Sequence, residues 1–406
     1  TTRRPRAHAG TPPPRSTRPA HRARSTAMPS DRRPLHRLHD LVYAPVEEHL
    51  TERRPLTVIP DGPLFHVPFS MFVTSMSGGR YAPSEARYVL HERPTSLELA
   101  SSLVADTARW SAEWSQFEPN LAAYGVSSFD TLRSVPPSLR TAAPEAISDS
   151  SLVLPSLPGV ERELRALQST VSDARVVLDE EVSERALCRS ARTAGVLHVA
   201  SHAFVNASSP LRNAILLRPG QREARPAGAG SDSNTALPGP SDGVLFLHEL
   251  QEQQSRIPMV VLSGCNTAAG TLRGGEGMEG LQYAFRAMGA QSTVSTLWPV
   301  ADQVSVELME AFYKHLRSGL PKDVALHRAQ LDFLEANPRK ASPFFWAPPV
   351  LYGSPATLPL DDSSRTAWTW WIFPGAGLAL ALLLGWWLWS RNVLSVRQTV
   401  ASTPGG

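Results

Sequence analysis

The chain has 406 residues, of which 42% are hydrophobic and 19% charged, a composition typical of a globular protein with a sizeable core. A formal net charge of +3 over this length argues against a nucleic-acid-binding protein. The two cysteines, Cys188 and Cys265, are too few for a disulfide framework or for a zinc site built on cysteines.

Residues 1–36 are dominated by Pro, Arg, Ser and Thr and show no apolar periodicity. Such a segment cannot bury a core, so we expect it to be a disordered leader. It lacks the apolar stretch of a secretory signal peptide. A basic arm that binds nucleic acid is the alternative interpretation, and a solvated leader is the one that we adopt.

Folding signals begin near residue 37, where apolar residues recur at helical spacing. A short strand is predicted over 56–59, ended by a Pro-Asp-Gly turn, and another strand over 87–92. Residues 105–150 are weakly patterned, and we expect a surface insertion there.

Strands and helices alternate from residue 154 onward, which predicts an α/β fold with a mostly parallel sheet. The run 259–263 is apolar throughout, as expected for a strand that is covered on both faces. Residues 219–242 are rich in Gly, Pro, Ala and Ser and predict a mobile loop inside the domain. The other predicted strands are 175–181, 196–201, 213–218 and 292–298. One helix is predicted directly after Pro158-Gly159, and further helices over 183–194, 277–289 and 302–319. Ser183 is expected to cap the second of these helices.

Residues 367–389 carry no charged side chain and form a segment long enough to cross a bilayer. Tryptophans stand at both ends, as in the aromatic belts of membrane spans. We therefore expect a single transmembrane helix, preceded by a linker at 357–366 and followed by a short tail at 390–406. A buried core helix is the alternative.

Two reactive side chains each follow an apolar strand of the predicted sheet. His202 comes directly after 196–201, and Cys265 lies just beyond 259–263. Open α/β sheets place their sites at the carboxyl ends of parallel strands, so both side chains are expected at that edge. A close imidazole would lower the pKa of the thiol and give a thiolate nucleophile. The alternative is an inert core cysteine and a histidine with only local hydrogen bonds.

Seven segments stand out in chain order between residues 37 and 355. They are LTVIPDGPLFHVPF, LPGVERELRAL, VLHVASHAF with NAILL, MVVLSGCNTAAG, GGEGMEGLQYAFRAMGAQSTVSTLWPVAD, FYKHLRSG and FFWAPPVLYG. As a set they resemble the successive motifs of the CHAT family, which are caspase-like domains often found beside tetratricopeptide repeats and related to separases.

The resemblance implies a caspase-like α/β fold, in which a mainly parallel sheet lies between helices and is preceded by a degenerate caspase-like half. On that pattern 37–150 is the N-terminal, non-catalytic part and 151–356 is the catalytic part. It also implies a cysteine endopeptidase that cleaves protein or peptide substrates through an acyl-enzyme, with Cys265 as nucleophile and His202 as base. No cofactor and no metal are implied.

The resemblance also suggests how a substrate would be held. Backbone N–H groups of Cys265 and Ala203 would bind the oxyanion, although the family often has the more flexible Gly where this chain has Ala203. Glu276 and Asp302 are candidates for the substrate cleft, the alternatives being a solvated loop acid and a helix N-cap. Trp298 resembles a family core position near the cleft, whereas His198 and Cys188 are interpreted as packing residues.

No tetratricopeptide repeat is visible in the sequence, so an upstream sensor or repeat protein is a candidate partner, together with the lipid bilayer. Because no signal peptide is found and a catalytic thiol must stay reduced, we expect a single-pass membrane protein with its catalytic domain in the cytoplasm. A catalytically silent CHAT scaffold, acting as a membrane-bound interaction module, is the rival from another functional class.

Overall fold

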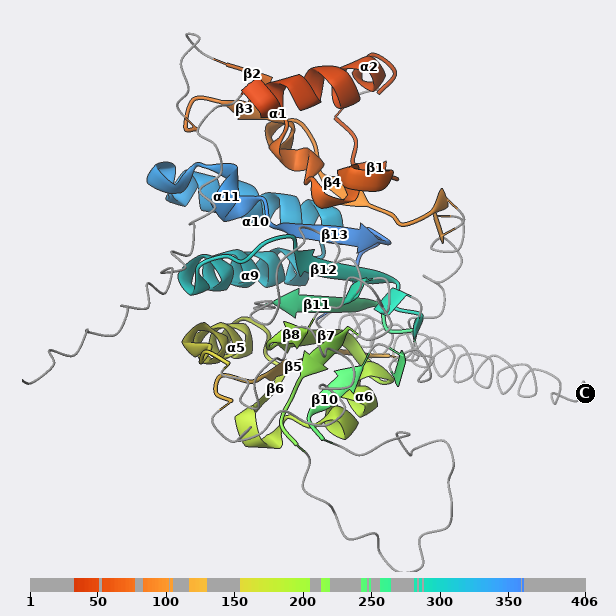
Figure 1. Ribbon diagram of the computed structural model, residues 1–406, viewed down its shortest axis with the longest axis vertical. Coiled ribbons are helices and arrows are strands. Elements are labelled where there is room, and N and C mark those ends of the chain that lie inside the picture. Colours follow the sequence, from red (N-terminus) through yellow and green to blue (C-terminus); the bar gives the residue numbers. More distant parts are fainter. Residues whose placement is uncertain are drawn as a thin grey trace, which may run out of the picture.

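The computed structural model describes residues between 33 and 360, and Figure 1 draws the rest as a thin grey trace. The leader before residue 33, nearly all of the loop 219–242, Cys265, Glu276 and the segment 367–389 lie outside the described residues. The described residues are 33–50, 53–76, 83–101, 103–104, 117–129, 154–204, 213–219, 242–246, 248–249, 256–263, 281–282, 285–286, 288–358 and 360.

An eight-stranded sheet has the strand order β1-β4-β13-β12-β11-β7-β5-β6 (Figure 1). The strands from β12 to β6 are parallel to one another, β13 is antiparallel to β12, and β4 and β1 are parallel to β13. The mainly parallel α/β sheet expected from the sequence is therefore confirmed. In sheet order the strands span Leu56–Val58, Thr95–Leu97, Pro349–Gly353, Ser292–Thr296, Met259–Ser263, Ala194–Ala200, Glu118–Gly125 and Arg175–Leu178.

One face of the sheet is covered by a layer of helices. Helices α5 (Pro158–Thr170) and α9 (Asp302–Arg317) pack against each other, and both contact His198 on β7. Helix α10 (Lys322–Ala336) continues the layer beside α9 (Figure 1). With helices on this side, every residue of β7 and of β11 is buried, which explains why both strands are rich in apolar residues.

Helix α6 (Glu184–Ala191) covers the opposite face. Tyr124 of β5 lies on that face, and its hydroxyl donates a hydrogen bond to the Ala186 carbonyl, 3.0 Å away. The predicted cap of this helix is confirmed, because the Ser183 hydroxyl accepts a hydrogen bond from the Ala186 N–H at 3.3 Å.

Strand β5 corrects the expectation of a surface insertion over 105–150. It lies in the interior of the sheet, where it pairs with β6 on one side and β7 on the other. Its sequence conceals this, because Pro119 is unfavourable inside a strand and Ala122 and Ala123 have little preference for one. The register with β7 shifts between Glu118 and Leu121.

The first described residues form helix α1 (Arg33–Leu38), a π-helical turn (His39–Tyr43) and α2 (Ala44–Glu47), so folding begins slightly before residue 37. The strand predicted over 87–92 is shorter than expected. Only β3 (Arg87–Tyr88) is extended, because the His91 ring accepts the Tyr88 N–H at 3.0 Å and closes a 3₁₀ turn. The remaining elements are β2 (Val73–Ser75), which pairs with β3, helix α11 (Pro343–Trp346), and 3₁₀ turns at Gly62–His66, Phe69–Met71, Val89–His91, Asp179–Glu181 and Pro338–Lys340.

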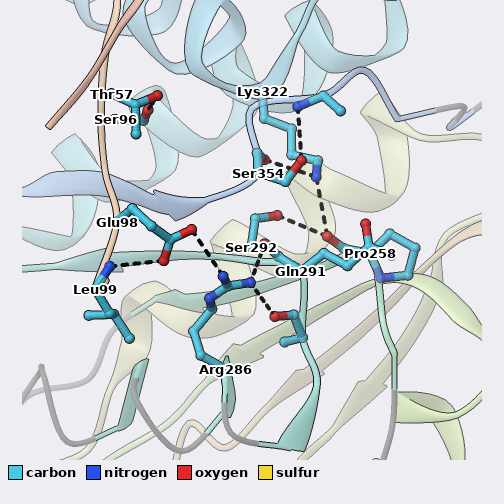
Figure 2. A network of polar contacts seen from close by, with 12 residues as sticks. Thr57, Ser96, Glu98, Leu99, Pro258, Arg286, Gln291, Ser292, Lys322 and Ser354 are labelled. Atoms are coloured by element: carbon cyan, nitrogen blue, oxygen red, sulfur yellow. Dashed lines mark hydrogen bonds and ion pairs between the residues drawn. The ribbon is translucent and has the colours of Figure 1, made fainter. Parts of the chain in front are cut away.

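A buried polar network joins the N-terminal part of the chain to the rest of the sheet (Figure 2). Glu98, next after β4, forms an ion pair with Arg286 at 3.0 Å, and both side chains are buried. Nearby, the ammonium group of Lys322 donates to the carbonyl oxygens of Pro258 (3.3 Å) and Ser354 (3.2 Å). β4 also pairs with β13, and β5 with β7, so strands from both sides of residue 150 lie in one sheet.

Candidate active site

Strands β7 and β11 are neighbours, and their register is known. They are parallel, and Ala200 at the end of β7 pairs with Ser263 at the end of β11. The prediction that both strands end at the same edge of the sheet is confirmed. Cys265 lies outside the described residues, so its distance from His202 stays a prediction.

The imidazole of His202 is buried, with 1% of the residue exposed, and is held on two sides. Its Nε2 lies 2.8 Å from the carbonyl oxygen of Pro155, and its ring centroid lies 4.9 Å from that of Phe129. A carbonyl can only accept, so Nε2 carries the proton, and Nδ1 is the basic nitrogen of the neutral ring. The sequence names no residue that orients His202 and leaves a backbone carbonyl as the candidate; in the structure the carbonyl of Pro155 lies against the ring.

Ala203 begins a small antiparallel sheet directly after His202. Strand β8 (Ala203–Phe204) pairs with β9 (Ala214–Leu216), which pairs with β10 (Val244–Phe246). The Leu216 N–H donates to the His202 carbonyl at 2.9 Å, so Ala203 and Ile215 form a non-hydrogen-bonded pair. In such a pair the Ala203 N–H points away from β9.

A cluster of buried polar side chains lies on the α5 and α9 side of β7. His198 Nε2 is 3.0 Å from Glu163 Oε1 on α5, and His198 Nδ1 is 3.1 Å from the Tyr313 hydroxyl on α9. Ser305 of α9 donates to Glu163 Oε2 at 2.9 Å, and its oxygen lies 3.1 Å from that of Ser263. His198, interpreted from the sequence as a packing residue, is fully buried and also has charged and polar neighbours.

Glu163 was missed in the sequence, although a signal was present. Its position places an acid on the apolar side of α5, between the buried residues Val160, Leu164 and Leu167. Burial by itself would raise the pKa of Glu163, but the contacts with His198, Ser263 and Ser305 outweigh it and hold the pKa below its usual value. The carboxylate is therefore ionised at neutral pH.

A family model for the CHAT domain matches residues 32–354. The chain belongs to the CHAT domain family. Tetratricopeptide repeat protein 28 of Mus musculus is 26% identical to it over 365 residues, and the human protein of that name is also 26% identical. In both cases the match covers 80% of this chain and 13% of the relative, so this CHAT domain spans only a small part of their length.

Among solved structures, the CHAT domain resembles gingipain R of Porphyromonas gingivalis, an Arg-specific cysteine proteinase. The TM-score is 0.41 at 8% identity, over 80% of this chain and 67% of that one. It also resembles the separase–securin complex of Saccharomyces cerevisiae, with a TM-score of 0.38 at 12% identity, over 68% of this chain and 15% of that one. TM-scores this low indicate only a loose likeness and say nothing about activity.

Asp302, a candidate for the substrate cleft, is exposed and is the first residue of α9. The N-cap position belongs to Ala301, which has no capping side chain, so the alternative of Asp302 as N-cap is wrong. Its side chain lies against Gly159 of α5. Trp298 is half-buried and donates from its indole N–H to the Phe344 carbonyl at 3.0 Å.

Cys188 is buried in α6, and burial raises the pKa of its thiol to about 12. It is therefore a protonated, unreactive thiol at neutral pH, in keeping with its interpretation as a packing residue.

Within the described part of the chain, His36, His39 and Asp40 form a group whose possible metal-ligand atoms lie within 4.8 Å of one another. Hydrogen bonds account for this arrangement, because His36 Nδ1 is 3.0 Å from the Val73 carbonyl oxygen and His39 Nδ1 is 3.2 Å from Asp40. Of the helices that the structure describes, none has the length and apolarity required to cross a membrane.

Proposed function

We propose that this CHAT domain is a cysteine endopeptidase that cleaves protein substrates through an acyl-enzyme, with Cys265 as nucleophile and His202 as base. The observation that carries the proposal is the fixed imidazole of His202 beside the strand that leads to Cys265. Ala200 and Ser263 are paired across the two strands. His202 follows Ala200 by two residues and Cys265 follows Ser263 by two, so each Cα lies at most about 7 Å from the Cα of the paired residue before it.

The chemistry follows from the tautomer of His202. Its Nδ1 accepts the thiol proton of Cys265, and the thiolate attacks the peptide carbonyl. The imidazolium then protonates the leaving amine, and water hydrolyses the thioester with His202 again as base. The Pro155 carbonyl, hydrogen-bonded to Nε2, stabilises the imidazolium while it exists.

The oxyanion of the tetrahedral intermediate needs donors that are in place before the reaction. The Ala203 N–H is suited to this role, because it is not used in the ladder with β9 and adjoins the base. The Cys265 N–H is the second donor that we propose. Asp302 and Glu276 are proposed residues of the substrate cleft, where their charge favours a basic substrate side chain.

The test is covalent labelling with fluorescent peptidyl chloromethyl ketones that vary in the residue before the cut. At least one reagent should label the wild-type chain, and Cys265→Ala should remove the label. Cys188→Ala is the matched control and should be labelled like the wild type, because its thiol is buried and protonated. Equal labelling of Cys265→Ala would refute the assignment of the nucleophile.

A catalytically silent CHAT scaffold is the second candidate, and two observations favour it. His202 is almost inaccessible, and Ala203 stands where the family often has Gly. For a scaffold, iodoacetamide would still modify Cys265, whereas no peptidyl reagent would do so. The N-terminal part, 37–150, is proposed to be a degenerate, non-catalytic half, in keeping with its lack of any cysteine that could serve as a nucleophile.

We also propose a membrane anchor at 367–389, with the catalytic domain in the cytoplasm, and a tetratricopeptide-repeat partner that controls it. The support is the uncharged, Trp-flanked sequence of the segment and the names of the relatives. Alkaline carbonate should not release the full chain from membranes, and truncation at residue 360 should give a soluble protein. Release of the full chain by carbonate would exclude the anchor.

A further inference from the structure

The segment that orients His202 is held against β7 at a second point. Pro155, just before α5, accepts a hydrogen bond from His202 at 2.8 Å. Eight residues later, Glu163 of α5 lies 3.0 Å from His198 of β7. His198 and His202 are four residues apart on β7 and its extension. The two contacts therefore fix the same segment against the same strand.

The second contact is costly to form, because it places a carboxylate where only 4% of its side chain is exposed. Removing an ionised group from water is unfavourable unless partners compensate for the lost hydration, and an apolar pair of similar size is often as stable. Fold stability is thus a poor reason for a charge at this position. A requirement for one defined position of α5 on β7 explains it better, because the carboxylate keeps both His198 at 3.0 Å and the hydrogen bond from the Ser305 hydroxyl only in that position.

The cluster also reaches the neighbouring catalytic strand. Ser305 donates to Glu163 and lies 3.1 Å from Ser263, the last residue of β11. Tyr313 meets His198 from the same helix, α9. The carboxylate of Glu163 thus connects α5 and α9 with His198 of β7 and, through Ser305, with the last residue of β11.

We propose that Glu163 is a positioning residue, whose buried carboxylate fixes α5 against β7 through His198 and thereby keeps the Pro155 carbonyl on the imidazole of His202. This inference rests on the proposed function, since it assigns to His202 the role of the base. Glu163 does not touch the reacting atoms, so its effect reaches them only through the orientation of the imidazole.

The principal variant is Glu163→Gln, which keeps the shape of the side chain and removes its charge. We expect kcat for a peptide substrate to fall about ten- to hundredfold with KM nearly unchanged, because a displaced base slows the chemical step without weakening binding. The His202 ring should also change. Nitrogen NMR of labelled histidine should show a protonated Nε2 in the wild type and a mixture of tautomers in the variant, the signal being assigned by its loss in His202→Asn.

Glu161→Gln is the matched control, because Glu161 lies on the same helix but is exposed. It should leave kcat and the His202 signal unchanged. If Glu163→Gln does not fold, Ser305→Ala takes its place, since it removes one donor to the carboxylate and leaves the carboxylate itself. Ser305→Ala should give a smaller loss of kcat and the same change of tautomer, whereas Ser318→Ala, the same change at the exposed end of α9, should have no effect.

The inference is overturned if folded Glu163→Gln or Ser305→Ala keeps the wild-type His202 signal, whatever happens to kcat. The NMR measurement needs no peptidase activity, so it remains decisive if the chain proves to be a scaffold. Conversely, if Cys265→Ala still cleaves while Glu163→Gln alters His202, the proposed function fails and the positioning of the ring by Glu163 stands.

Discussion

His202 owes its geometry to neighbours rather than to its own strand, since a carbonyl and an aromatic ring hold its imidazole. If it acts with Cys265 as one unit, His202→Ala and Cys265→Ala should each abolish cleavage, and the double variant should be no slower than either. Steady-state cleavage of the peptide selected by labelling measures this, with Cys188→Ala near wild type as control. Additive losses in the double variant would contradict a shared step.

Lys322 is a fully buried residue whose charge is sensitive to pH near neutrality. Burial, assisted by the charge of Arg286, lowers the pKa of its ammonium group to about 7 from an ordinary 10.5. Between these values the unfolded chain binds more protons than the folded chain, so the free energy of unfolding should rise as pH rises from 7 toward 10.5. The slope should be on the order of 1 kcal/mol per pH unit.

Lys322→Met isolates this effect from other titrating groups. Urea unfolding of both chains at pH 7 and pH 9.5 gives the difference in the free energy of unfolding at each pH. The free energy of unfolding of the wild type should rise relative to that of the variant as pH rises, because only the wild type has a buried ammonium group that loses its proton. If the difference in the free energy of unfolding is the same at both pH values, the pKa of Lys322 is not lowered in the folded state.

At the scale of elements, the approach of α5 to α9 depends on Gly159. A Cβ at this position would overlap the Asp302 side chain, beginning at the Asp302 Cβ, which cannot rotate away. Gly159→Ala should therefore cost about 1–3 kcal/mol of stability and, because α5 carries Glu163, should also lower kcat. Urea unfolding and peptide cleavage measure the two effects.

Asp302→Gly is the relieving change, since it removes the whole side chain that the new methyl group would meet. In the double variant the loss in the free energy of unfolding should be smaller than the sum of the losses in the two single variants. Simple additivity would mean that the two helices do not meet in the way described.

How far the sequence predicts these elements depends on how local their signals are. β11 matches its prediction residue for residue, because burial on both faces selects a continuous apolar run, Met259 to Leu262, before the polar Ser263 at its end. β5 was missed, because its small residues and its proline suit only the particular neighbours that the sheet provides. Pairing between β5 and β7, distant in sequence, cannot be read from local pattern.

The same division applies to the candidate site. The strand end that carries His202 could be predicted, because an apolar strand followed by a polar residue is a local pattern. The sequence places Glu163 on the apolar side of α5, but the contacts of Glu163 and of the Pro155 carbonyl with β7 could not be predicted, since only the packing of α5 brings them there. Neither contact has a sequence signature that specifies its partner.

At the scale of the whole molecule, the region expected to be the N-terminal part contributes to the same sheet as the catalytic part. β5 lies between β6 and β7, and Leu121 and Tyr124 are fully buried in the main core. Without β5, strand β6 has no partner in the sheet and β7 has an exposed edge. The fragment 151–356 should therefore be insoluble or molten, whereas 33–360 should unfold cooperatively.

A third fragment, 117–356, separates the contribution of β5 from that of the first strands. It restores the partner of β6 and β7 but lacks Glu98, which leaves the buried Arg286 without its ion-pair partner. An unpaired buried charge is strongly destabilising, so 117–356 should be folded but less stable than 33–360, and Arg286→Met should recover part of the loss in that fragment alone. Circular dichroism and urea unfolding of the three fragments test this order. A cooperative, fully stable 151–356 would show instead that the catalytic part folds independently of the residues before it.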